Sequence, residues 1–214
     1  YATPFLSADR IAGGVAWWRA NEDALERAEA KWGVPPEIVV AIVGIETSYG
    51  RLTGSFRVID ALATLAFDYP RRAPFFRGEL KEFLLLSGEQ GFTPLVPKGS
   101  FAGAMGVPQF MPGSFRRYAV DFDGDARIDL WGSAADVVGS VANYLARHDW
   151  QPGGQTIVPA AIADEHRDAV LRRLDGGTSE RRPLDAWAGD GVGPATLVEP
   201  VDEPVGLLML EESP

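Results

Sequence analysis

Apolar residues recur at the three- and four-residue spacing of a helix through much of residues 7 to 150. The pattern predicts one or two helices from Ser7 to Trp32, with Ser7 as the N-cap and Gly33 as the residue that ends the segment. Further helices are predicted over Val58–Tyr69, Pro74–Ser87 and Ser114–Val120. Another is predicted to follow Ser133 as its N-cap and to reach about His148. This succession predicts a mainly α region.

One predicted helix ends in a carboxyl group. The segment from Pro35 to Arg51, PPEIVVAIVGIETSYGR, opens with two prolines, which suit a first helical turn. Glu46 directly follows its predicted buried face, which consists of Ile38, Val39, Ile42 and Ile45. A carboxyl group where a buried helix opens into a loop is partly desolvated, which raises its pKa as a general acid requires. The alternative is a glutamate that points into solvent at a helix C-terminus.

The apolar periodicity weakens after Trp150, where glycine, proline and aspartate become frequent. The stretch from Gln151 to Gly154 is the predicted boundary between a helical region, residues 1–150, and a small mixed region, residues 151–214. In the small region the pattern predicts a helix over Ala163–Leu174 and a strand over Val205–Leu210. The predicted fold class is therefore mainly α, of the α+β type.

The composition is that of a globular protein, and it excludes several kinds of chemistry. Of the 214 residues, 46% are hydrophobic and 23% are charged. The absence of cysteine excludes disulfides and thiolate nucleophiles, and two histidines are too few for a multi-histidine metal site. The net charge of −10 argues against nucleic acid as a partner and against electrostatic docking to anionic lipid. The longest apolar stretches are too short to span a membrane.

A glycine-rich segment, KGSFAGAMGVPQFMP from Lys98 to Pro112, is a candidate binding loop. Its glycines allow the backbone to approach a ligand or another chain segment closely. Ser100 and Gln109 offer hydrogen-bonding groups among phenylalanine and methionine side chains, a mixture that suits the polar edges and apolar faces of a sugar. The alternative is a packed loop that uses its glycines for tight turns and binds nothing.

The segment DFDGDARIDLW, Asp121 to Trp131, is a candidate metal loop. Its carboxylates fall at positions one, three and five of an EF-hand-type loop: Asp121, Asp123 and Asp125. Arg127 would supply its backbone carbonyl at position seven. Position twelve lacks the usual glutamate, so Asp136 on the next helix is the candidate closing ligand. An all-oxygen ligand set favours a structural Ca²⁺, and the alternative is a solvated acidic turn.

Together these segments resemble the lytic murein transglycosylase B family. The matching stretches cover most of residues 10 to 150 in the family's order: GVPPEIVVAIVGIETSYGR, RVIDALATLAFDYPRRAPFFRGELKEFLLL, KGSFAGAMGVPQFMPGSFRRYAVDFDGDARIDLW and DVVGSVANYLARHDW. The resemblance implies a lysozyme-like helical core with an additional helical region and a small β-containing domain. It also implies cleavage of the β-1,4 bond between N-acetylmuramic acid and N-acetylglucosamine in peptidoglycan, with a 1,6-anhydromuramoyl product.

The resemblance also implies roles for individual residues. Glu46 matches the family's single catalytic acid and base, and the acidic loop matches an EF-hand-like metal site over residues 121–136. The positions that match contacts to the sugar or its peptide are Ser100, Gln109, Arg72, Tyr144 and Tyr1. From residue type alone, Arg72 is a solvated cation at a helix end and Tyr144 a core or rim residue.

The resemblance further implies a periplasmic monomer that acts on peptidoglycan glycan strands, with outer-membrane attachment through a lipidated N-terminus that precedes Tyr1. Val107 stands where family members often have tyrosine. The family continues into an Arg-Tyr-Asn motif and a final helix that this sequence lacks, so residues 151–214 are expected to be truncated relative to the family. Three alternatives therefore stay open: a hydrolytic muramidase, an inactive glycan-binding module, and a calcium-binding protein without a glycan role.

Overall fold

The computed structural model describes residues 5–154, 156–174, 178–196 and 204–209. Phe5–Gly153 forms one compact unit, called here the helical unit. The described residues from Gly154 onward form a second, the C-terminal unit. Among the described residues, no helix combines the length and the apolar character that crossing a bilayer requires.

Two helices at the start of the helical unit confirm the first prediction. They are α2, Ala8–Ala20, and α3, Glu22–Trp32. The Ser7 hydroxyl caps α2 by accepting the Arg10 N–H at 3.4 Å. Gly33 ends α3 in the left-handed conformation, with φ of +66°. A side chain there would also collide with the ring of Pro152, so the position needs glycine for two reasons.

Helix α4, Pro36–Thr47, buries the predicted face only in part. Val39 and Val43 are completely buried, whereas Ile45 is 49% exposed. Ile38 and Ile42 also pack against the core, so the prediction fails only at Ile45, because a segment that is apolar almost all round does not reveal where its buried face ends. In the structure Val39 and Val40 pack into one apolar cluster with α3 and α8, and Val43 packs into a second.

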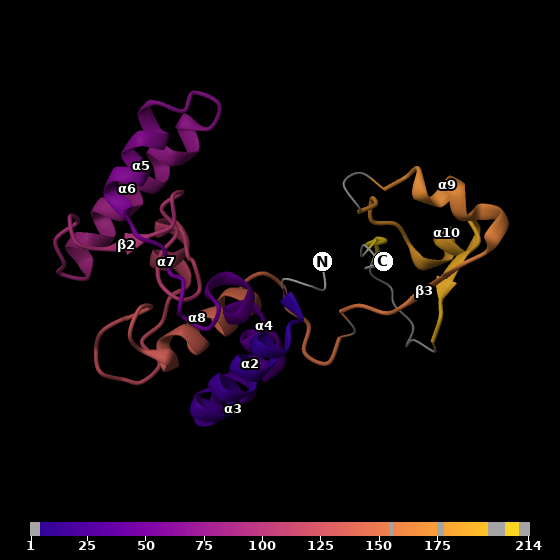
Figure 1. Cartoon of the computed structure of the whole chain (residues 1–214), viewed down its shortest axis with the longest axis horizontal. Helices are drawn as coiled ribbons and strands as arrows, with labels where there is room; N and C mark the ends of the chain where they lie inside the picture. The colour runs from indigo at the N-terminus through magenta and orange to yellow at the C-terminus, as the bar shows by residue number, and fades with distance from the viewer. Residues whose placement is uncertain (1–4, 155, 175–177, 197–203, 210–214) are drawn as a thin grey trace. The chain divides into compact units, whose positions relative to one another are not determined.

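Helices α5, Val58–Phe67, and α6, Ala73–Glu89, lie side by side, apart from the group of α2, α3, α4 and α8 (Figure 1). Their shared core includes Leu62, Phe76 and Phe83. Helix α6 continues beyond its predicted end at Ser87. Before α5 the chain forms β1, Phe56–Arg57, which pairs antiparallel with β2, Lys98–Gly99.

The chain from β2 to α7, Pro112–Tyr118, is mostly irregular, as its glycines predict. Isolated bridges hold it together, with Met105 paired to both Gly99 and Phe110. Helix α8, Ala134–Ala146, follows the acidic loop. Ser133 caps α8 as predicted, by accepting the Asp136 N–H at 3.2 Å.

The C-terminal unit is a small antiparallel ribbon with short helices. Strand β3, Ala160–Ile162, pairs with β4, Val192–Pro194. The predicted helix over Ala163–Leu174 is present only as two shorter elements, a 3₁₀ turn over Asp164–His166 and α9 over Arg167–Leu171, and α10 spans Leu184–Ala188. In place of the predicted strand over Val205–Leu210, the described residues form isolated bridges at Val205 and Leu208, and Leu210 lies outside the described residues.

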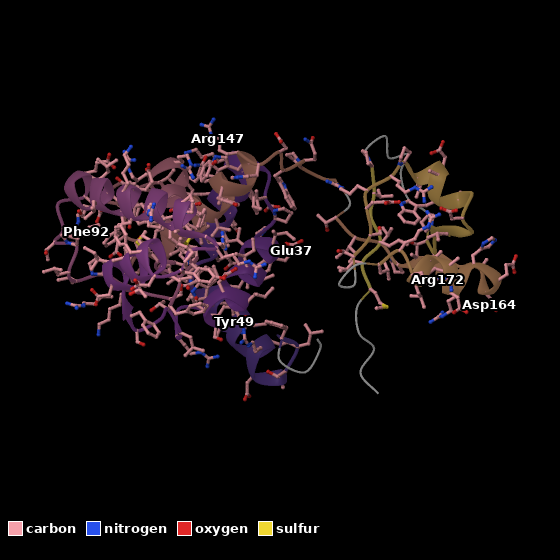
Figure 2. The ribbon with its side chains drawn as sticks, turned by 90° about the horizontal axis from the view of Figure 1, so that it is seen from above. Glu37, Tyr49, Phe92, Arg147, Asp164 and Arg172 are labelled. Carbon is pink, nitrogen blue, oxygen red and sulfur yellow. The ribbon has the colours of Figure 1, made fainter. Side chains whose placement is uncertain are left out.

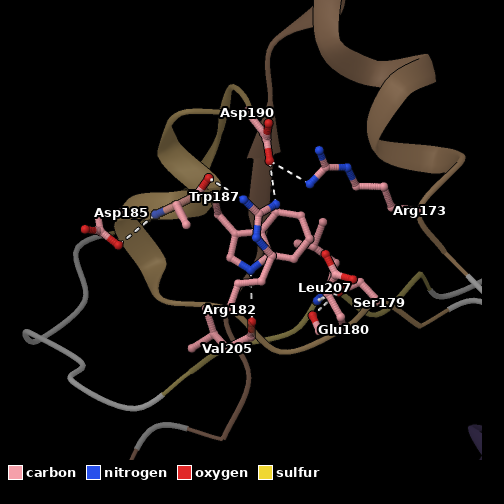
Figure 3. Close-up of polar contacts among 10 residues, drawn as sticks. Arg173, Ser179, Glu180, Arg182, Asp185, Trp187, Asp190, Val205 and Leu207 are labelled. Carbon is pink, nitrogen blue, oxygen red and sulfur yellow. Dashed lines mark hydrogen bonds and ion pairs between the residues drawn. The ribbon is translucent and has the colours of Figure 1, made fainter.

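An ion-pair arrangement covers the core of the C-terminal unit (Figure 3). The carboxylate of Asp190 pairs with Arg173 at 2.8 Å and with Arg182 at 2.5 Å. The Arg182 guanidinium lies 4.7 Å from the ring centroid of Trp187, which is buried. The Trp187 indole donates to the Val205 carbonyl at 2.9 Å, so its one polar group is satisfied. These contacts fix the position of Trp187 in the core of the C-terminal unit.

A pair of glycine substitutions tests the fold around the glycine-rich loop. Gly106 has φ of +68°, and an added Cβ would lie 2.5 Å from the Leu130 carbonyl oxygen. We expect Gly106→Ala to lower the free energy of unfolding by at least about 1 kcal/mol.

Gly78 lies inside α6 with no atom near the position of an added Cβ, so Gly78→Ala should raise the free energy of unfolding by about 0.5–1 kcal/mol. Urea titrations of both variants measure the two changes. Equal effects of the same sign would contradict the described backbone.

Candidate active site and acidic loop

Glu46 occupies the last turn of α4 and is exposed as a whole residue. Among the described residues its carboxylate has no hydrogen bond and no ion pair. Desolvation is the cause that raises the pKa of Glu46 above its ordinary value, and no neighbouring charge contributes. The expectation that Glu46 directly follows a buried face was wrong, because Ile45 and Glu46 are both exposed at the end of α4. The direction of the pKa shift nevertheless agrees with the sequence argument, because nothing offsets the partial loss of hydration.

The turn that follows Glu46 is unusual and tightly held. Ser48, Tyr49 and Gly50 all have positive φ, at 52°, 64° and 84°. For residues other than glycine this conformation costs of order 1–3 kcal/mol each and persists only where the surroundings determine it. Tyr49 supplies that restraint, because its hydroxyl donates to the Arg10 carbonyl at 3.0 Å. A Cβ added at Gly44 would lie only 2.7 Å from the Tyr49 hydroxyl oxygen. The ring therefore fits against glycine in α4.

Thr47 joins this turn to the glycine-rich loop. Its buried hydroxyl donates to the Val107 carbonyl at 2.9 Å and accepts the Gly50 N–H at 3.0 Å. The residue next to Glu46 is thereby tied to a segment 60 positions further along the chain. Sequence reasoning missed Thr47, because a threonine at the end of an apolar helix carries no signal of its distant partner. The contact places the end of α4 beside the loop.

Ser100 and Gln109 both hold the loop together. The Ser100 hydroxyl oxygen accepts the N–H groups of Ala102 at 3.2 Å and Ala104 at 3.0 Å. The Gln109 side-chain amide donates to the carbonyls of Thr53 at 3.2 Å and Gly106 at 2.8 Å. Within the described residues, the Ser100 hydroxyl proton and the Gln109 side-chain carbonyl remain unused, so each side chain keeps one group for a ligand.

Tyr144 belongs to an aromatic cluster beside this loop. Its ring stacks on His148 with a centroid distance of 4.0 Å, and it meets Phe110 at 5.4 Å and Tyr118 at 5.2 Å. Phe110 directly follows Gln109, so the cluster adjoins the candidate binding loop.

The remaining predicted contact residues are not part of this network. Arg72 is exposed where α6 begins, and its guanidinium lies over the rings of Phe75 and Phe76 on its own helix. Tyr1 lies outside the described residues. Contacts of adjacent residues link Glu46 to the loop and Tyr144: Thr47 bonds to Val107, and Phe110 meets Tyr144. The ring contacts of Arg72 are with its own helix.

The acidic loop brings together three of the predicted metal ligands. Carboxylate oxygens of Asp121, Asp123 and Asp136 lie within 4.8 Å of one another. Asp125 is exposed and outside that group, and its carboxylate accepts the Arg127 N–H at 2.9 Å. Arg127 is itself exposed. The converging oxygens are of the type that a hard cation such as Ca²⁺ prefers.

Asp136 is the buried member of this group, at 1% exposure. Its carboxylate accepts the backbone N–H of Phe122 at 2.7 Å and of Asp129 at 2.8 Å. Burial is the main cause that raises the pKa of Asp136, and the nearby charge of Asp123 adds to it. The Ser133 hydroxyl donates to Asp123 at 2.6 Å and is the main cause that lowers the pKa of Asp123. A cation at this place would offset the repulsion between the carboxylates, so the residues fit a bound metal.

Comparison with known proteins places these features in a family. Residues 1–213 match the family described as the transglycosylase SLT domain. Over 160 residues the chain is 53% identical to membrane-bound lytic murein transglycosylase B of Escherichia coli K12, a match that covers 75% of this chain and 44% of the relative. Sequence similarity to this relative thus spans less than half of its length.

Two solved structures have the same fold at high similarity. The catenated lytic transglycosylase SltB1 of Pseudomonas aeruginosa is 46% identical, with a TM-score of 0.88 over 95% of this chain and 66% of that one. The Escherichia coli lytic transglycosylase Slt35, solved in complex with calcium, is 44% identical, with a TM-score of 0.85 over 98% of this chain and 64% of that one.

These matches confirm the predicted mainly helical, lysozyme-like fold. The family match extends over nearly the whole chain and agrees with the resemblance carried by its motifs. The chain therefore belongs to the transglycosylase SLT domain family.

Proposed function

We propose that this chain is a lytic transglycosylase that cleaves the β-1,4 bond between N-acetylmuramic acid and N-acetylglucosamine in peptidoglycan. One observation carries the proposal: desolvation raises the pKa of Glu46, at a helix end that the Thr47–Val107 hydrogen bond ties to the glycine-rich loop. An acid with a raised pKa keeps its proton closer to neutral pH, where it can be transferred to a leaving oxygen. The family and its relatives named as lytic transglycosylases support the same reaction.

In the proposed mechanism Glu46 acts first as acid and then as base. Its carboxyl proton passes to the glycosidic oxygen as the bond from C1 to that oxygen breaks. The resulting carboxylate then removes the proton of the muramoyl 6-hydroxyl, whose oxygen closes on C1 and forms the 1,6-anhydro ring. The carboxyl group regains its proton, and no water is consumed.

A second catalytic carboxylate is not required by this mechanism. Most glycosidases place two carboxyl groups about 5–9.5 Å apart. Desolvation is the cause given for the raised pKa of Glu46, and among the described residues its carboxylate has no ion pair. The substrate's own acetamido group can stabilise the positive charge at C1 instead. This electrostatic isolation favours a transglycosylase over a two-carboxylate muramidase.

We assign the contacts to the glycan from the unused groups around the loop. The Ser100 hydroxyl and the Gln109 carbonyl would bond to polar edges of the sugars, and Tyr144 would offer an aromatic face beside them. Arg72 and Tyr1 are proposed as further contacts to the glycan or its peptide on the basis of the family resemblance. The glycan strand is then the partner, the protein acts as a monomer, and the periplasm, where peptidoglycan lies, is the compartment.

The acidic loop would hold one Ca²⁺ through Asp121, Asp123 and Asp136, with Asp125 and the Arg127 carbonyl as further ligands. The calcium complex of Slt35 supports this proposal. The ion's contribution would be structural, because it neutralises converging carboxylates at the start of α8 and leaves the proton transfers to Glu46.

Replacement of Glu46 tests the reaction and its product together. Mass spectrometry of digested peptidoglycan should show 1,6-anhydromuramoyl ends with the parent protein, and Glu46→Gln should reduce their formation at least about 1000-fold, which is about 4 kcal/mol of transition-state stabilisation. Glu37→Gln, at an exposed position in the first turn of the same helix, is the matched control and should retain the parental rate. Reducing ends that contain added water would identify a muramidase instead.

The pH dependence follows from the direction of the Glu46 pKa. As pH rises through a raised pKa the acid loses the proton that it must donate, so activity should fall along a limb centred above 4.5, the ordinary value. A limb centred at or below 4.5 would contradict the assignment. The free energy of unfolding should also fall as pH rises through this range, because the unfolded chain ionises this group at lower pH than the folded protein does. Glu46→Gln should therefore lose less stability than the parent as pH rises through this range.

Calcium removal tests the acidic loop. A ligand that binds only the native state stabilises it, by about 4 kcal/mol at a concentration 1000 times the Kd. We expect EGTA to lower Tm by several degrees and excess calcium to restore it. Asp136→Asn should lose this response, whereas Asp9→Asn, outside the loop, should keep it. An unchanged Tm in the parent protein under both conditions would remove the metal proposal.

A further inference from the structure

A cavity of about 530 Å³ lies in the helical unit and adjoins the glycine-rich loop, because the Gln109 amide donates to the carbonyl of Thr53, one of the lining residues. Four short segments form it, within residues 53–54, 90–92, 96–98 and 127–131, and Glu46 is not among the residues that line it. Figure 2 shows Phe92, which lines the cavity, well apart from Tyr49 in the turn after Glu46. The mechanism proposed for Glu46 makes no use of this space.

The walls of the cavity are fastened to one another. The Trp131 indole N–H donates to the Lys98 carbonyl at 3.1 Å, which joins the end of the acidic loop to β2. The carboxylate of Asp129 accepts the backbone N–H groups of Trp131 and Gly132, both at 2.9 Å. The first of these bonds links two of the four segments and the other two order the segment from residue 127 to 131, and the cavity volume is in the range of small-molecule sites, about 300–1000 Å³.

Two cations, Lys98 and Arg127, and one carboxylate, that of Asp129, line this cavity. Lys98 and Arg127 are both exposed, and in the described parts of the chain neither side chain takes part in an ion pair. The carboxylate of Asp129 is already engaged by two backbone N–H groups. The charged side chains of the lining therefore sum to +1, from Lys98 and Arg127 less Asp129, in a chain with a net charge of −10.

The rest of the lining is apolar or aromatic. Phe92 and Trp131 provide flat surfaces, and Val96 and Pro97 provide aliphatic ones. A neutral sugar would leave both cations unused, whereas a carboxylate would pair with Lys98 and could form a forked interaction with Arg127. The apolar lining suits small aliphatic side chains next to that carboxylate.

We propose that this cavity binds the terminal carboxylate of a short peptide with small apolar side chains. The chemistry of the cavity assigns the ligand class, and only its source rests on the proposed function. Peptidoglycan glycan strands carry short peptides of this kind, so the cavity would recognise a peptide stem while Glu46 acts on the sugar chain.

The indole N–H of Trp131 reports directly on the cavity. In a two-dimensional ¹⁵N NMR titration with D-alanyl-D-alanine and calcium in excess, the Trp131 indole signal should shift, and Trp131→Phe would identify it. The indoles of Trp150 and Trp187, which donate to carbonyls elsewhere, should not shift. The C-terminal amide of the same dipeptide should bind at least about 10-fold more weakly, since it lacks the charge. Equal binding of acid and amide, or no binding of the acid, would overturn the proposal.

A double variant tests the two cations. Lys98→Ala combined with Arg127→Ala keeps the backbone carbonyls and should weaken dipeptide binding at least about 10-fold. Arg147→Ala is the matched control, because Arg147 is an exposed cation at the C-cap of α8 and lies away from Phe92 in Figure 2. An unchanged affinity in the double variant would assign the binding to another place and defeat the proposal.

Glycan fragments with and without peptide stems separate the two sources of ligand. If the stem is the ligand, the parent should bind stem-bearing fragments more tightly and the double variant should lose that preference. If only free dipeptide responds to the variant, the cavity takes a free peptide. This measurement also separates the proposals, because Glu46→Gln should lose cleavage and still bind the dipeptide.

Discussion

The hydroxyl group of Thr47 is the contact on which the candidate site depends. It is buried, it donates to the Val107 carbonyl, and it accepts the Gly50 N–H. One side chain thereby satisfies backbone groups in two segments, and a buried backbone group without a partner would be costly. The acid at the end of α4 and the loop with Ser100 and Gln109 share a neighbourhood because this contact joins them. The reactive group and its binding loop thus come from distant parts of the chain.

The turn after Glu46 shows how the fold restrains an unfavourable backbone. Consecutive positive φ angles at Ser48 and Tyr49 are maintained by the Tyr49 ring, which packs where glycines leave room, and by its hydrogen bond to Arg10. This restraint limits where the Glu46 carboxyl can point. The carboxyl is left without a hydrogen bond or charge partner among the described residues, so partial desolvation alone determines the direction of its pKa shift.

The acidic loop follows a different principle, in which backbone N–H groups hold carboxylates in place. Asp136 receives the N–H groups of Phe122 and Asp129, one from each side of the loop, and so connects its two ends to α8. The same loop continues into Trp131, whose indole reaches β2. Through these bonds the candidate metal site and the cavity beside it share one wall. A change in the acidic loop would therefore affect both the candidate metal site and the cavity.

The sequence by itself determined most helices of the helical unit, the caps at Ser7, Gly33 and Ser133, the class of fold, and the choice of the candidate acid and metal ligands. These features depend on local spacing, as with Ser7, Gly33 and Ser133, or on motifs that the family shares. Only the tertiary structure decided where the buried face of α4 ends, that Thr47 links the turn to the loop, and that Asp125 lies outside the group of converging carboxylates. The reason is physical: a helix that is apolar on all sides, a hydroxyl with a partner far along the chain, and a cavity between four segments leave no periodic pattern in a linear sequence.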